Sequence, residues 1–555
     1  MARSTSIKYE PLSMTSPTQD AYCIQTSPSQ RKFATTRLIL RAIACLCFLV
    51  SACLVITWTG IPRQPINYDN AIRTTKTSRP LQPPGPPQSD LSRQRQKQIR
   101  DSFQLAYANF VTYAGEHDEI RPVSLGHSDP RNGWGATTVD SMTTLFVMDL
   151  EEHLQAAINH TVHTDFTKSR VPGQHTSVFE TNIRYLGGIL STYELTGANH
   201  TELLDKAVDI ANELGVAWGG NSKIPHPSVS VDDNHAVLHH DTTLAEAGSL
   251  TLEFDRLSYW TGNDSYRFTA DSTSRALMSN PQVFPGLHAQ NIYLYNGLPQ
   301  GDYVGWGGSS DSFYEYAVKY WQLIGDQAVD YVRYWQEAII SSRKHLLRWS
   351  EDRKHPYLTE YSANGGGTRN FMTHLACFAP GNWMLGGKLL EKDDVFALGL
   401  KLAETCYDSY NSTSSGLGPD KFSYDKSLVV LKGEFVMRPE VLESMWYAWR
   451  LTGDPVWQER AWLIFEAIER NCKVDGGYRG LRNVEQPGWG SIDSSESFVF
   501  AETFKYLYLM FSPRSHFSLD EWVFTTEAHP FKIRVSKDLP LTNLSNQTDS
   551  SNNQA

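Results

Sequence analysis

Apolar positions recur with the period of an α-helix along most of the chain between residues 99 and 537. In VWQERAWLIFEAIER, for example, the apolar residues Trp457, Ala461, Ile464, Phe465 and Ile468 share one helical face. Runs with the alternating pattern of a β-strand are few. The periodicity therefore predicts an all-α domain over residues 99–537.

A helix that ends in a short glycine turn recurs along this region. The turn glycines Gly197, Gly262 and Gly325 lie 65 and 63 residues apart, and Gly453 follows 128 residues later, close to two further periods. A period of this length corresponds to an αα-hairpin, and such hairpins must stack to bury their apolar faces. The region has room for about seven hairpins. Because we see no polar capping repeat, we expect a closed ring and not an open solenoid.

The N-terminal residues follow a different pattern. Residues 42–61 (AIACLCFLVSACLVITWTGI) carry no charge and are long enough to cross a bilayer as one helix. Basic residues at positions 31, 32, 37 and 41 precede them, so the positive-inside rule predicts a single-pass type II protein with its main body in the lumen of the secretory pathway. The alternative, a buried helix of a soluble protein, is disfavoured by the Pro-rich stretch that follows.

The segments on either side of this predicted span have low-complexity compositions. Residues 1–41 are expected to be a disordered cytosolic tail, and residues 62–98, which contain RPLQPPGPPQSD, an extended luminal stem. Residues 538–555 are polar and are also expected to be disordered. The predicted organisation is a tail, a signal-anchor helix, a stem, one large helical domain and a second tail.

Charge indicates which partners the protein does not bind, and cysteine content indicates the compartment in which it folds. The net charge of −11 over 555 residues argues against a nucleic-acid partner. Of seven cysteines, only Cys377, Cys406 and Cys472 lie in the predicted luminal part, where one disulfide and one free thiol would fit. Six glycosylation sequons agree with a luminal location, namely Asn159, Asn199, Asn263, Asn411, Asn543 and Asn546.

Carboxylates interrupt several helices that are otherwise apolar, and burying them is costly unless they are paired or functional. Each one alone is also compatible with a solvated helix position or a capping group. Gathered at one end of a ring, they would line a cleft suited to cleavage of a glycosidic bond by an acid and a base, or to a hard cation such as calcium. The residues concerned are Glu180, Glu246, Glu253, Asp311, Glu315, Glu440, Glu443, Glu496 and Glu502.

Eight motifs, in the same order, resemble those of glycoside hydrolase family 47, the class I α-1,2-mannosidases, and span nearly the whole predicted luminal body. They are NGWGATTVDSMTTLFVM, FETNIRYLGG, LAEAGSLTLEF, DSFYEY, HLACFAPG, RPEVLES, ESFVFAETFKYLYLMF and TEAHP. The resemblance implies an (α/α)7 barrel, a calcium ion at its base, and inverting hydrolysis of terminal α-1,2-linked mannose from high-mannose N-glycans.

The resemblance also implies roles for individual residues. Glu180 and Asp311 are alternative proton donors, Glu440 is the general base, and Thr526 binds calcium directly. Cys377 and Cys406 form a disulfide, which leaves Cys472 free. Residues that resemble those holding the sugar or the waters of the ion are Arg184, Glu246, Glu315, His374, Arg438, Glu443, Phe498, Glu502 and Glu527.

Three positions depart from the family pattern. Thr525 replaces an Asn beside the metal residue, and Ser495 replaces a Met before ESF. Ser309 stands where members of the endoplasmic reticulum that remove one mannose tend to have Arg, so the chain is more similar to fungal and Golgi-type members with broader trimming.

Other functions stay open at this point. The main alternative is a mannosidase-like factor that recognises glycans in quality control and endoplasmic-reticulum-associated degradation. The cysteine pair and the short segment after TEAHP favour the processing enzyme. An inactive structural or adhesion protein on a helical toroid, and a glycosidase on a six-hairpin barrel, are less consistent with the motifs. We expect a monomeric luminal domain, resident in either the Golgi or the endoplasmic reticulum.

Overall fold

The computed structural model describes residues 76–85, 87–219, 223–424 and 426–534. Within these ranges the chain is mainly helical, as its periodicity predicts. No helix in this part of the chain is both long and apolar enough to span a bilayer. The predicted span at 42–61 and both predicted tails lie outside the described residues.

Seven helices of the described chain form an inner ring. Nearly every residue in them is buried, and an element that is buried on all sides needs no polar face. They are α4 (Ala136–Val147), α7 (Gly187–Leu195), α10 (Thr251–Thr261), α12 (Asp311–Ile324), α14 (Ala379–Leu389), α16 (Glu440–Thr452) and α18 (Phe504–Phe511).

A second set of helices covers the inner ring and buries one face only. In α8, for instance, the buried residues Leu203, Ala207, Ile210 and Leu214 follow the helical period, while the opposite face meets solvent. The outer helices are α3 (Asp90–Ala114), α5 (Glu151–His163), α8 (Thr201–Gly215), α11 (Asp264–Met278), α13 (Val329–His345), α15 (Asp393–Asn411) and α17 (Val456–Asn471).

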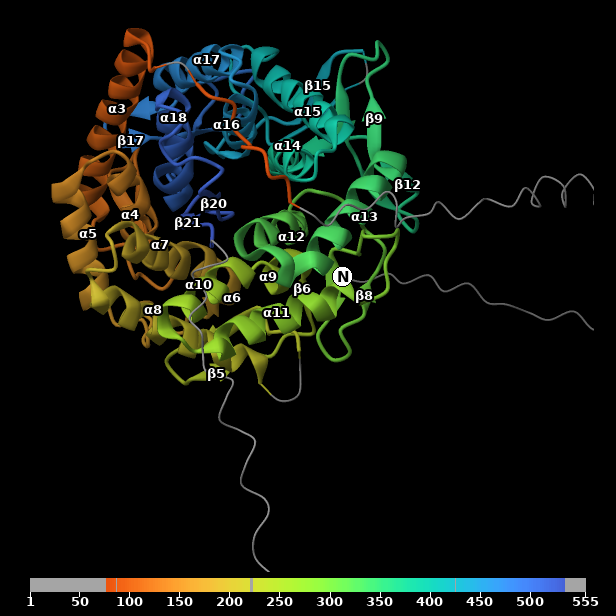
Figure 1. Ribbon diagram of the computed structural model, residues 1–555. Helices are drawn as coiled ribbons and strands as arrows, with labels where there is room; N and C mark the ends of the chain where they lie inside the picture. The colour runs from red at the N-terminus through yellow and green to blue at the C-terminus, as the bar shows by residue number, and fades with distance from the viewer. Residues whose placement is uncertain (1–75, 86, 220–222, 425, 535–555) are drawn as a thin grey trace, which may run out of the picture. The chain divides into compact units, whose positions relative to one another are not determined.

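The contacts between helices close the ring (Figure 1). Each inner helix from α4 to α18 contacts the next, and α18 returns to α4. Six outer helices follow their inner partners along the chain, whereas α3, the first outer helix, packs on α18, the last inner helix. The first and the last long helices of the described chain, α3 and α18, therefore pack together. The helices close into a ring and do not form an open stack with two exposed ends.

Short helical segments and hairpins connect the long helices. The short helices are α6 (Val178–Glu180), η1 (Thr181–Leu186), η2 (Val216–Trp218), α9 (Leu244–Gly248), η3 (Gly325–Ala328), η4 (Leu375–Phe378) and η5 (Val499–Thr503). Of these, η1 and η5 are π-helical, a form often found at functional sites.

The described strands pair in antiparallel sheets of two or three strands. The three-stranded sheets are β3–β4–β5, β6–β7–β8 and β13–β14–β15. The strands are β1 (Glu119–Arg121), β2 (Gly126–Ser128), β3 (Thr176–Ser177), β4 (Ser228–Ser230), β5 (His235–Ala236), β6 (Asp241–Thr243), β7 (Asn291–Tyr293), β8 (Pro299–Gln300), β9 (Leu347–Trp349), β10 (Pro356–Leu358), β11 (Glu360–Ser362), β12 (Gly367–Arg369), β13 (Met372–Thr373), β14 (Lys421–Tyr424), β15 (Leu428–Lys432), β16 (Lys473–Val474), β17 (Gly477–Tyr478), β18 (Gly480–Leu481), β19 (Ser491–Ile492), β20 (Trp522–Phe524) and β21 (Pro530–Lys532).

The hairpin β20–β21 enters the ring (Figure 1) and is held there by buried hydrogen bonds from inner helices. Lys505 Nζ of α18 donates to the carbonyl of Ala528 at 2.7 Å, and Ser191 Oγ of α7 donates to the carbonyl of Pro530 at 2.7 Å. The loop 525–529 is thereby fixed inside the ring, because a buried carbonyl that lost its donor would be costly.

The packed unit begins earlier than the predicted boundary at residue 99. Helix α3 starts at Asp90, and the hydroxyl of Ser89 caps it by accepting a hydrogen bond from the Ser92 N–H at 3.1 Å. Before it, Leu81 is buried, and the Gln82 amide donates to the carbonyl of Arg514 at 2.8 Å. The described part of the predicted stem thus packs on the helices, because Leu81 and Gln82 find apolar and polar partners there.

Candidate active site

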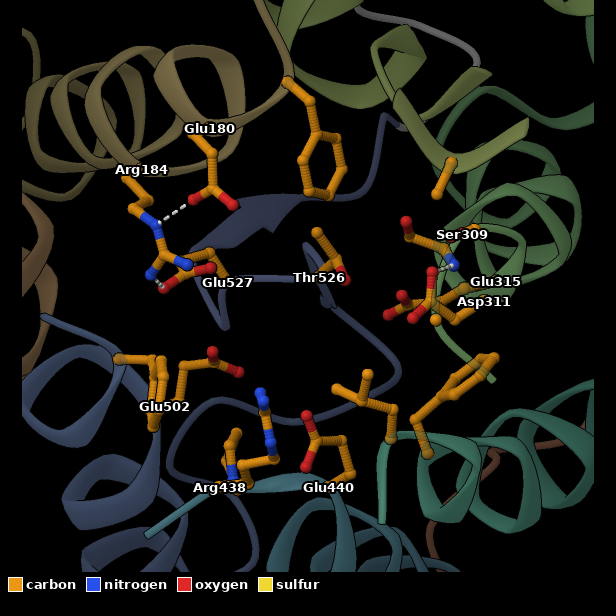
Figure 2. A pocket seen from close by; sticks show the side chains of 18 of the residues that line it. Glu180, Arg184, Ser309, Asp311, Glu315, Arg438, Glu440, Glu502, Thr526 and Glu527 are labelled. Atoms are coloured by element: carbon orange, nitrogen blue, oxygen red, sulfur yellow. Dashed lines mark hydrogen bonds and ion pairs between the residues drawn. The ribbon is translucent and has the colours of Figure 1, made fainter. Parts of the chain in front are cut away.

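A cavity of about 410 Å³ lies inside the ring, within the size range of small-ligand sites. Figure 2 shows labelled residues such as Glu180, Asp311 and Glu440 around the cavity. Arg131, Phe179, Glu496 and other residues share its wall with predicted site residues. The predicted residues that line it are Glu180, Arg184, Glu246, Asp311, Glu315, Arg438, Glu440, Glu443, Phe498, Glu502, Thr526 and Glu527.

Helix starts bring several of these carboxylates to the cavity. Asp311 is the first residue of α12, and Glu440 is the first residue of α16. Glu246 lies in the first turn of α9, where it forms a capping box with Thr243. The partial positive charge of a helix N-terminus favours an ionised carboxylate, so these positions suit acidic residues.

Arg184 links one wall of the cavity to the loop 525–529. Its Nε donates to Glu180 at 2.6 Å, and its Nη1 donates to Ser497 Oγ at 3.1 Å and to Glu527. Its guanidinium carbon lies 6.0 Å from the centre of the Phe498 ring. Arg184 therefore orients two carboxylates and an aromatic ring that line the same cavity (Figure 2).

Glu180 is held in its ionised form. Burial favours the neutral acid, but Arg184 and Arg131 outweigh it and lower the pKa of Glu180 to about 2. Arg131 Nε lies 3.3 Å from Glu180 Oε2, and this arginine also pairs with Glu119 and Glu496. Arg131 is not among the residues that the motifs predict, although it lies directly before the NGWG motif.

Glu440 is joined to His374 and Tyr410. His374 Nδ1 lies 2.7 Å from Glu440 Oε2, and His374 Nε2 lies 2.6 Å from the Tyr410 hydroxyl. Burial would raise the pKa of Glu440, but the hydrogen bond from His374 and the charge of Arg438 lower it. His374 is buried behind Glu440 and does not line the cavity, so its place fits a partner of the base better than the predicted sugar contact.

The same contacts indicate the tautomer of His374. Burial first, and then the charge of Glu440, raise the pKa of Tyr410 well above its usual range, so the phenol keeps its proton. With hydrogen on Nδ1, the His374 ring donates to Glu440, and its Nε2 accepts from the Tyr410 hydroxyl. Tyr410 lies on the outer helix α15 and belongs to none of the sequence motifs.

Asp311 has the opposite electrostatic environment. Burial, followed by the nearby charges of Glu315 and Glu440, raises its pKa to about 7, although Arg438 and the N–H of Ser312 act in the other direction. The Ser312 N–H lies 3.0 Å from Asp311 Oδ1. Asp311 can therefore carry a proton near neutral pH, whereas Glu180 cannot.

Carboxylates crowd around Thr526 at the base of the cavity. Burial, then repulsion between acidic groups, raises the pKa values of Glu502 and Glu527 well above the usual range. The same two causes raise the pKa of Glu443 to about 8, although Lys319 acts against them. A divalent cation would relieve this repulsion, and the oxygen donors of these side chains and of Thr526 are the ligands calcium prefers.

Glu253 is the one acidic residue predicted from the apolar helices that does not line the cavity. It is fully buried and accepts hydrogen bonds from Tyr316 Oη at 2.7 Å and from Asn182 Nδ2 at 3.0 Å. Tyr316 Oη also lies 3.4 Å from the backbone nitrogen of Thr526. Glu253 thus supports the loop that carries Thr526 from behind.

The disulfide implied by the motifs is present between Cys377 and Cys406. The disulfide joins η4 to α15. Cys377 in η4 follows His374 by three residues, and Tyr410 lies one turn after Cys406 on α15. Among the described cysteines, Cys472 is free, and burial raises the pKa of its thiol to about 12. Cys472 is therefore an unreactive core residue.

Comparison with known proteins agrees with this geometry. Mannosyl-oligosaccharide alpha-1,2-mannosidase 1B of Aspergillus oryzae is 34% identical over 480 residues, which cover 80% of this chain and 93% of that protein. Mannosyl-oligosaccharide alpha-1,2-mannosidase of Coccidioides posadasii is 34% identical over 478 residues, 80% of this chain and 91% of that protein.

A solved structure gives the same result for the fold. The alpha-1,2-mannosidase from Trichoderma reesei matches with a TM-score of 0.76 and 34% identity, covering 80% of this chain and 99% of that chain. The sequence model described as glycosyl hydrolase family 47 matches residues 102–533, a range that contains the whole helical ring apart from the start of α3. The chain belongs to glycosyl hydrolase family 47.

Proposed function

We propose that this protein is a calcium-dependent, inverting exo-α-1,2-mannosidase that trims terminal α-1,2-linked mannose from high-mannose N-glycans of glycoproteins. The observation that carries the proposal is the separation of the carboxyl pKa values around one cavity. Glu440 is held ionised, whereas Asp311 has a pKa of about 7. An acid and a base with separated pKa values are what hydrolysis of a glycosidic bond requires.

In the proposed reaction, Glu440 removes a proton from a water molecule as its oxygen attacks the anomeric carbon of the terminal mannose. The bond from that carbon to the glycosidic oxygen breaks, and Asp311 gives its proton to the departing oxygen. His374 holds the base in position from behind. Glu180, with a pKa of about 2, stays ionised between two arginines and orients Arg184.

The cation site is proposed for calcium. Thr526 would bind the ion directly, and Glu246, Glu315, Glu443, Glu502 and Glu527 would hold its waters or the sugar. When bound, calcium supplies positive charge to the hydroxyls of the terminal sugar. The clustered carboxylates with raised pKa values support this assignment.

A second cavity supports cleavage at the end of a glycan. It has a volume of about 560 Å³, and Ser309, Leu375 and Arg438 line both cavities. We infer that the terminal mannose enters the inner cavity while the following sugars lie in the outer one. The small Ser309 side chain at the junction supports trimming of more than one branch.

We further propose that the enzyme is a type II membrane protein of the Golgi or the endoplasmic reticulum, with a monomeric luminal domain. The disulfide supports an oxidising compartment, and the uncharged stretch at 42–61 supports the anchor.

The decisive experiment incubates the full chain, purified in detergent, with a high-mannose N-glycan in calcium, in EDTA, and in EDTA followed by excess calcium. We expect mannose release that stops on chelation and returns with calcium, and the first sugar detected by NMR should be the β-anomer. Glu440→Gln should lower kcat by about 10²–10⁴-fold. Binding of the glycan without release of mannose would instead support the alternative, a glycan-recognition factor in quality control.

A further inference from the structure

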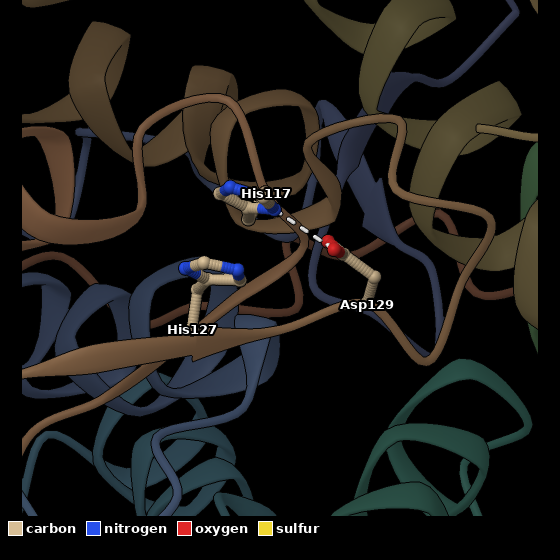
Figure 3. A group of neighbouring side chains, drawn as sticks. All are labelled: His117, His127 and Asp129. Carbon is tan, nitrogen blue, oxygen red and sulfur yellow. Dashed lines mark hydrogen bonds and ion pairs between the residues drawn. The ribbon is translucent and has the colours of Figure 1, made fainter. Parts of the chain in front are cut away.

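Two histidines and one aspartate converge outside the active-site cavity. One ligand atom from each of His117, His127 and Asp129 lies within 4.8 Å of the other two. His117 precedes the hairpin β1–β2, His127 lies in β2, and Asp129 directly follows β2. Figure 3 shows a nitrogen of each histidine ring on the side that faces the Asp129 carboxylate. None of them lines the cavity around Thr526.

The backbone of the hairpin explains the convergence. His127 lies in the middle of β2, paired with Ile120 of β1, and Asp129 follows two residues later. Side chains two residues apart on an extended chain project to the same side. His117 precedes β1, and its Nδ1 lies 2.8 Å from Asp129 Oδ2. The other oxygen of Asp129 accepts the Asp118 N–H at 3.0 Å, which orients the carboxylate.

The two histidine rings lie stacked against each other. His117 and His127 are stacked with their centres 3.4 Å apart and their planes 9° from parallel. An imidazole ring binds a metal ion through the lone pair of one ring nitrogen. His127 is exposed, so its ring can turn out of the stack to aim that lone pair at an ion.

We propose that His117, His127 and Asp129 bind one divalent transition-metal ion of the zinc class, at a site separate from the calcium site of the cavity. Two imidazole nitrogens and one carboxylate oxygen match the ligand preference of zinc, whereas calcium prefers oxygen ligands alone. Water would complete the coordination, since the cluster is open to solvent.

The site also has a structural consequence. Asp118, which lies beside His117, accepts the backbone N–H groups of Arg131 at 2.7 Å and of Gly133 at 2.9 Å. An ion bridging residues 117, 127 and 129 would therefore brace the loop that carries Arg131 to the cavity. We expect the ion to raise thermal stability.

The test uses the full chain, saturated with calcium so that the acidic cavity is occupied, and titrated with Zn²⁺ by calorimetry. We expect one tight equivalent of zinc and a higher Tm. Asp129→Asn, which preserves size, and His127→Ala should each weaken binding by about tenfold or more and abolish the rise in Tm. The matched control is His235→Ala, which removes another exposed histidine on a hairpin, and it should bind zinc like the wild type.

Co²⁺ provides a second readout, because its visible absorption reports the ligands. A spectrum that shifts in His127→Ala but not in His235→Ala supports the site. The proposal is overturned if the wild type binds no zinc, or if Asp129→Asn and His127→Ala bind it as the wild type does. Both variants should keep the far-UV circular-dichroism spectrum of the wild type, which shows that they are folded and keeps this test independent of the proposed activity.

Discussion

Two carboxyl side chains on the cavity wall differ in protonation because their neighbours differ. Glu180 lies between Arg131 and Arg184, and its pKa falls to about 2. Asp311 is buried near other carboxylates, and its pKa rises to about 7. The motifs predict these two residues as alternative proton donors, and the charges around them favour Asp311.

This assignment predicts the pH dependence of the reaction. Asp311 must be protonated, so kcat/KM should fall as the pH rises above about 7. Glu440 must be ionised, so activity should also fall when the pH drops below the lowered pKa of that residue. Asp311→Asn should lower kcat by about 10²–10⁴-fold and remove the alkaline fall. If Glu180→Gln removes the alkaline fall while Asp311→Asn keeps it, the two roles are reversed.

A second prediction concerns Tyr410, which touches His374 but not the cavity. Tyr410→Phe removes the hydrogen bond between the Tyr410 hydroxyl and His374 Nε2, which holds the ring with Nδ1 directed at Glu440. The loss of one buried hydrogen bond, about 1–1.5 kcal/mol, should lower kcat about tenfold with little change in KM.

The fall of activity at low pH (the acid limb) distinguishes a positioning role of Tyr410 from a general loss of stability in Tyr410→Phe. With a less well-placed donor, the pKa of Glu440 should rise, and the acid limb should move to higher pH. Tyr407→Phe, a change on the same helix, is the control and should leave both kcat and the limb unchanged. An unchanged limb in Tyr410→Phe would show that Tyr410 does not position the base.

The inner and the outer helices contribute different residues to the site. Inner helices are buried nearly all round and present their N-terminal residues, such as Asp311 and Glu440, to the cavity. Outer helices bury one face against them, and α15 also contributes Tyr410. The disulfide from Cys377 to Cys406 fixes α15 against the segment that carries His374.

The disulfide should therefore affect both stability and catalysis. It joins cysteines 29 residues apart, and a loop of that length corresponds to about 3–4 kcal/mol of stabilisation in the chain-entropy treatment. The double variant Cys377→Ala with Cys406→Ala should lower the Tm measured by calorimetry and also lower kcat. Cys472→Ala, which removes a buried free thiol, is the control for cysteine loss. A variant with wild-type kcat would show that α15 stays in place without the bridge.

The molecule as a whole is a closed ring whose centre holds an acidic loop. Carboxylates from α12, α16 and η5 meet the loop 525–529 inside the ring. Burial first, and then their mutual repulsion, raise the pKa values of Glu443, Glu502 and Glu527, so keeping these groups ionised in the ring costs free energy.

Calcium removal should consequently destabilise the whole ring. A ligand at one hundred times its dissociation constant stabilises a protein by about 2.7 kcal/mol. EDTA should lower the Tm measured by calorimetry, and excess calcium should restore it. Thr526→Ala should lose most of this calcium-dependent change while keeping the Tm of the chelated wild type. Equal Tm values with and without calcium in the wild type would place the ion elsewhere or exclude it.

Periodicity along the chain was enough to predict a mainly helical fold, because each amphipathic helix repeats its pattern locally. Turn glycines at regular intervals were enough to predict stacked helical hairpins, and the lack of a polar capping repeat was the basis for predicting a closed ring. Ordered motifs were enough to identify the family and to select twelve residues that line one cavity. Each of these features depends on residues that are close together in the sequence.

Packing settled what depends on residues far apart in the chain. It brought Arg131 beside Glu180, and Tyr410 and His374 behind Glu440, so it determined which carboxyl groups are ionised. It also placed Leu81 and Gln82 against the helical body, where composition alone predicted an extended stem. A pKa depends on burial and on distances to other charges, and a pattern along the chain contains neither until the chain has folded.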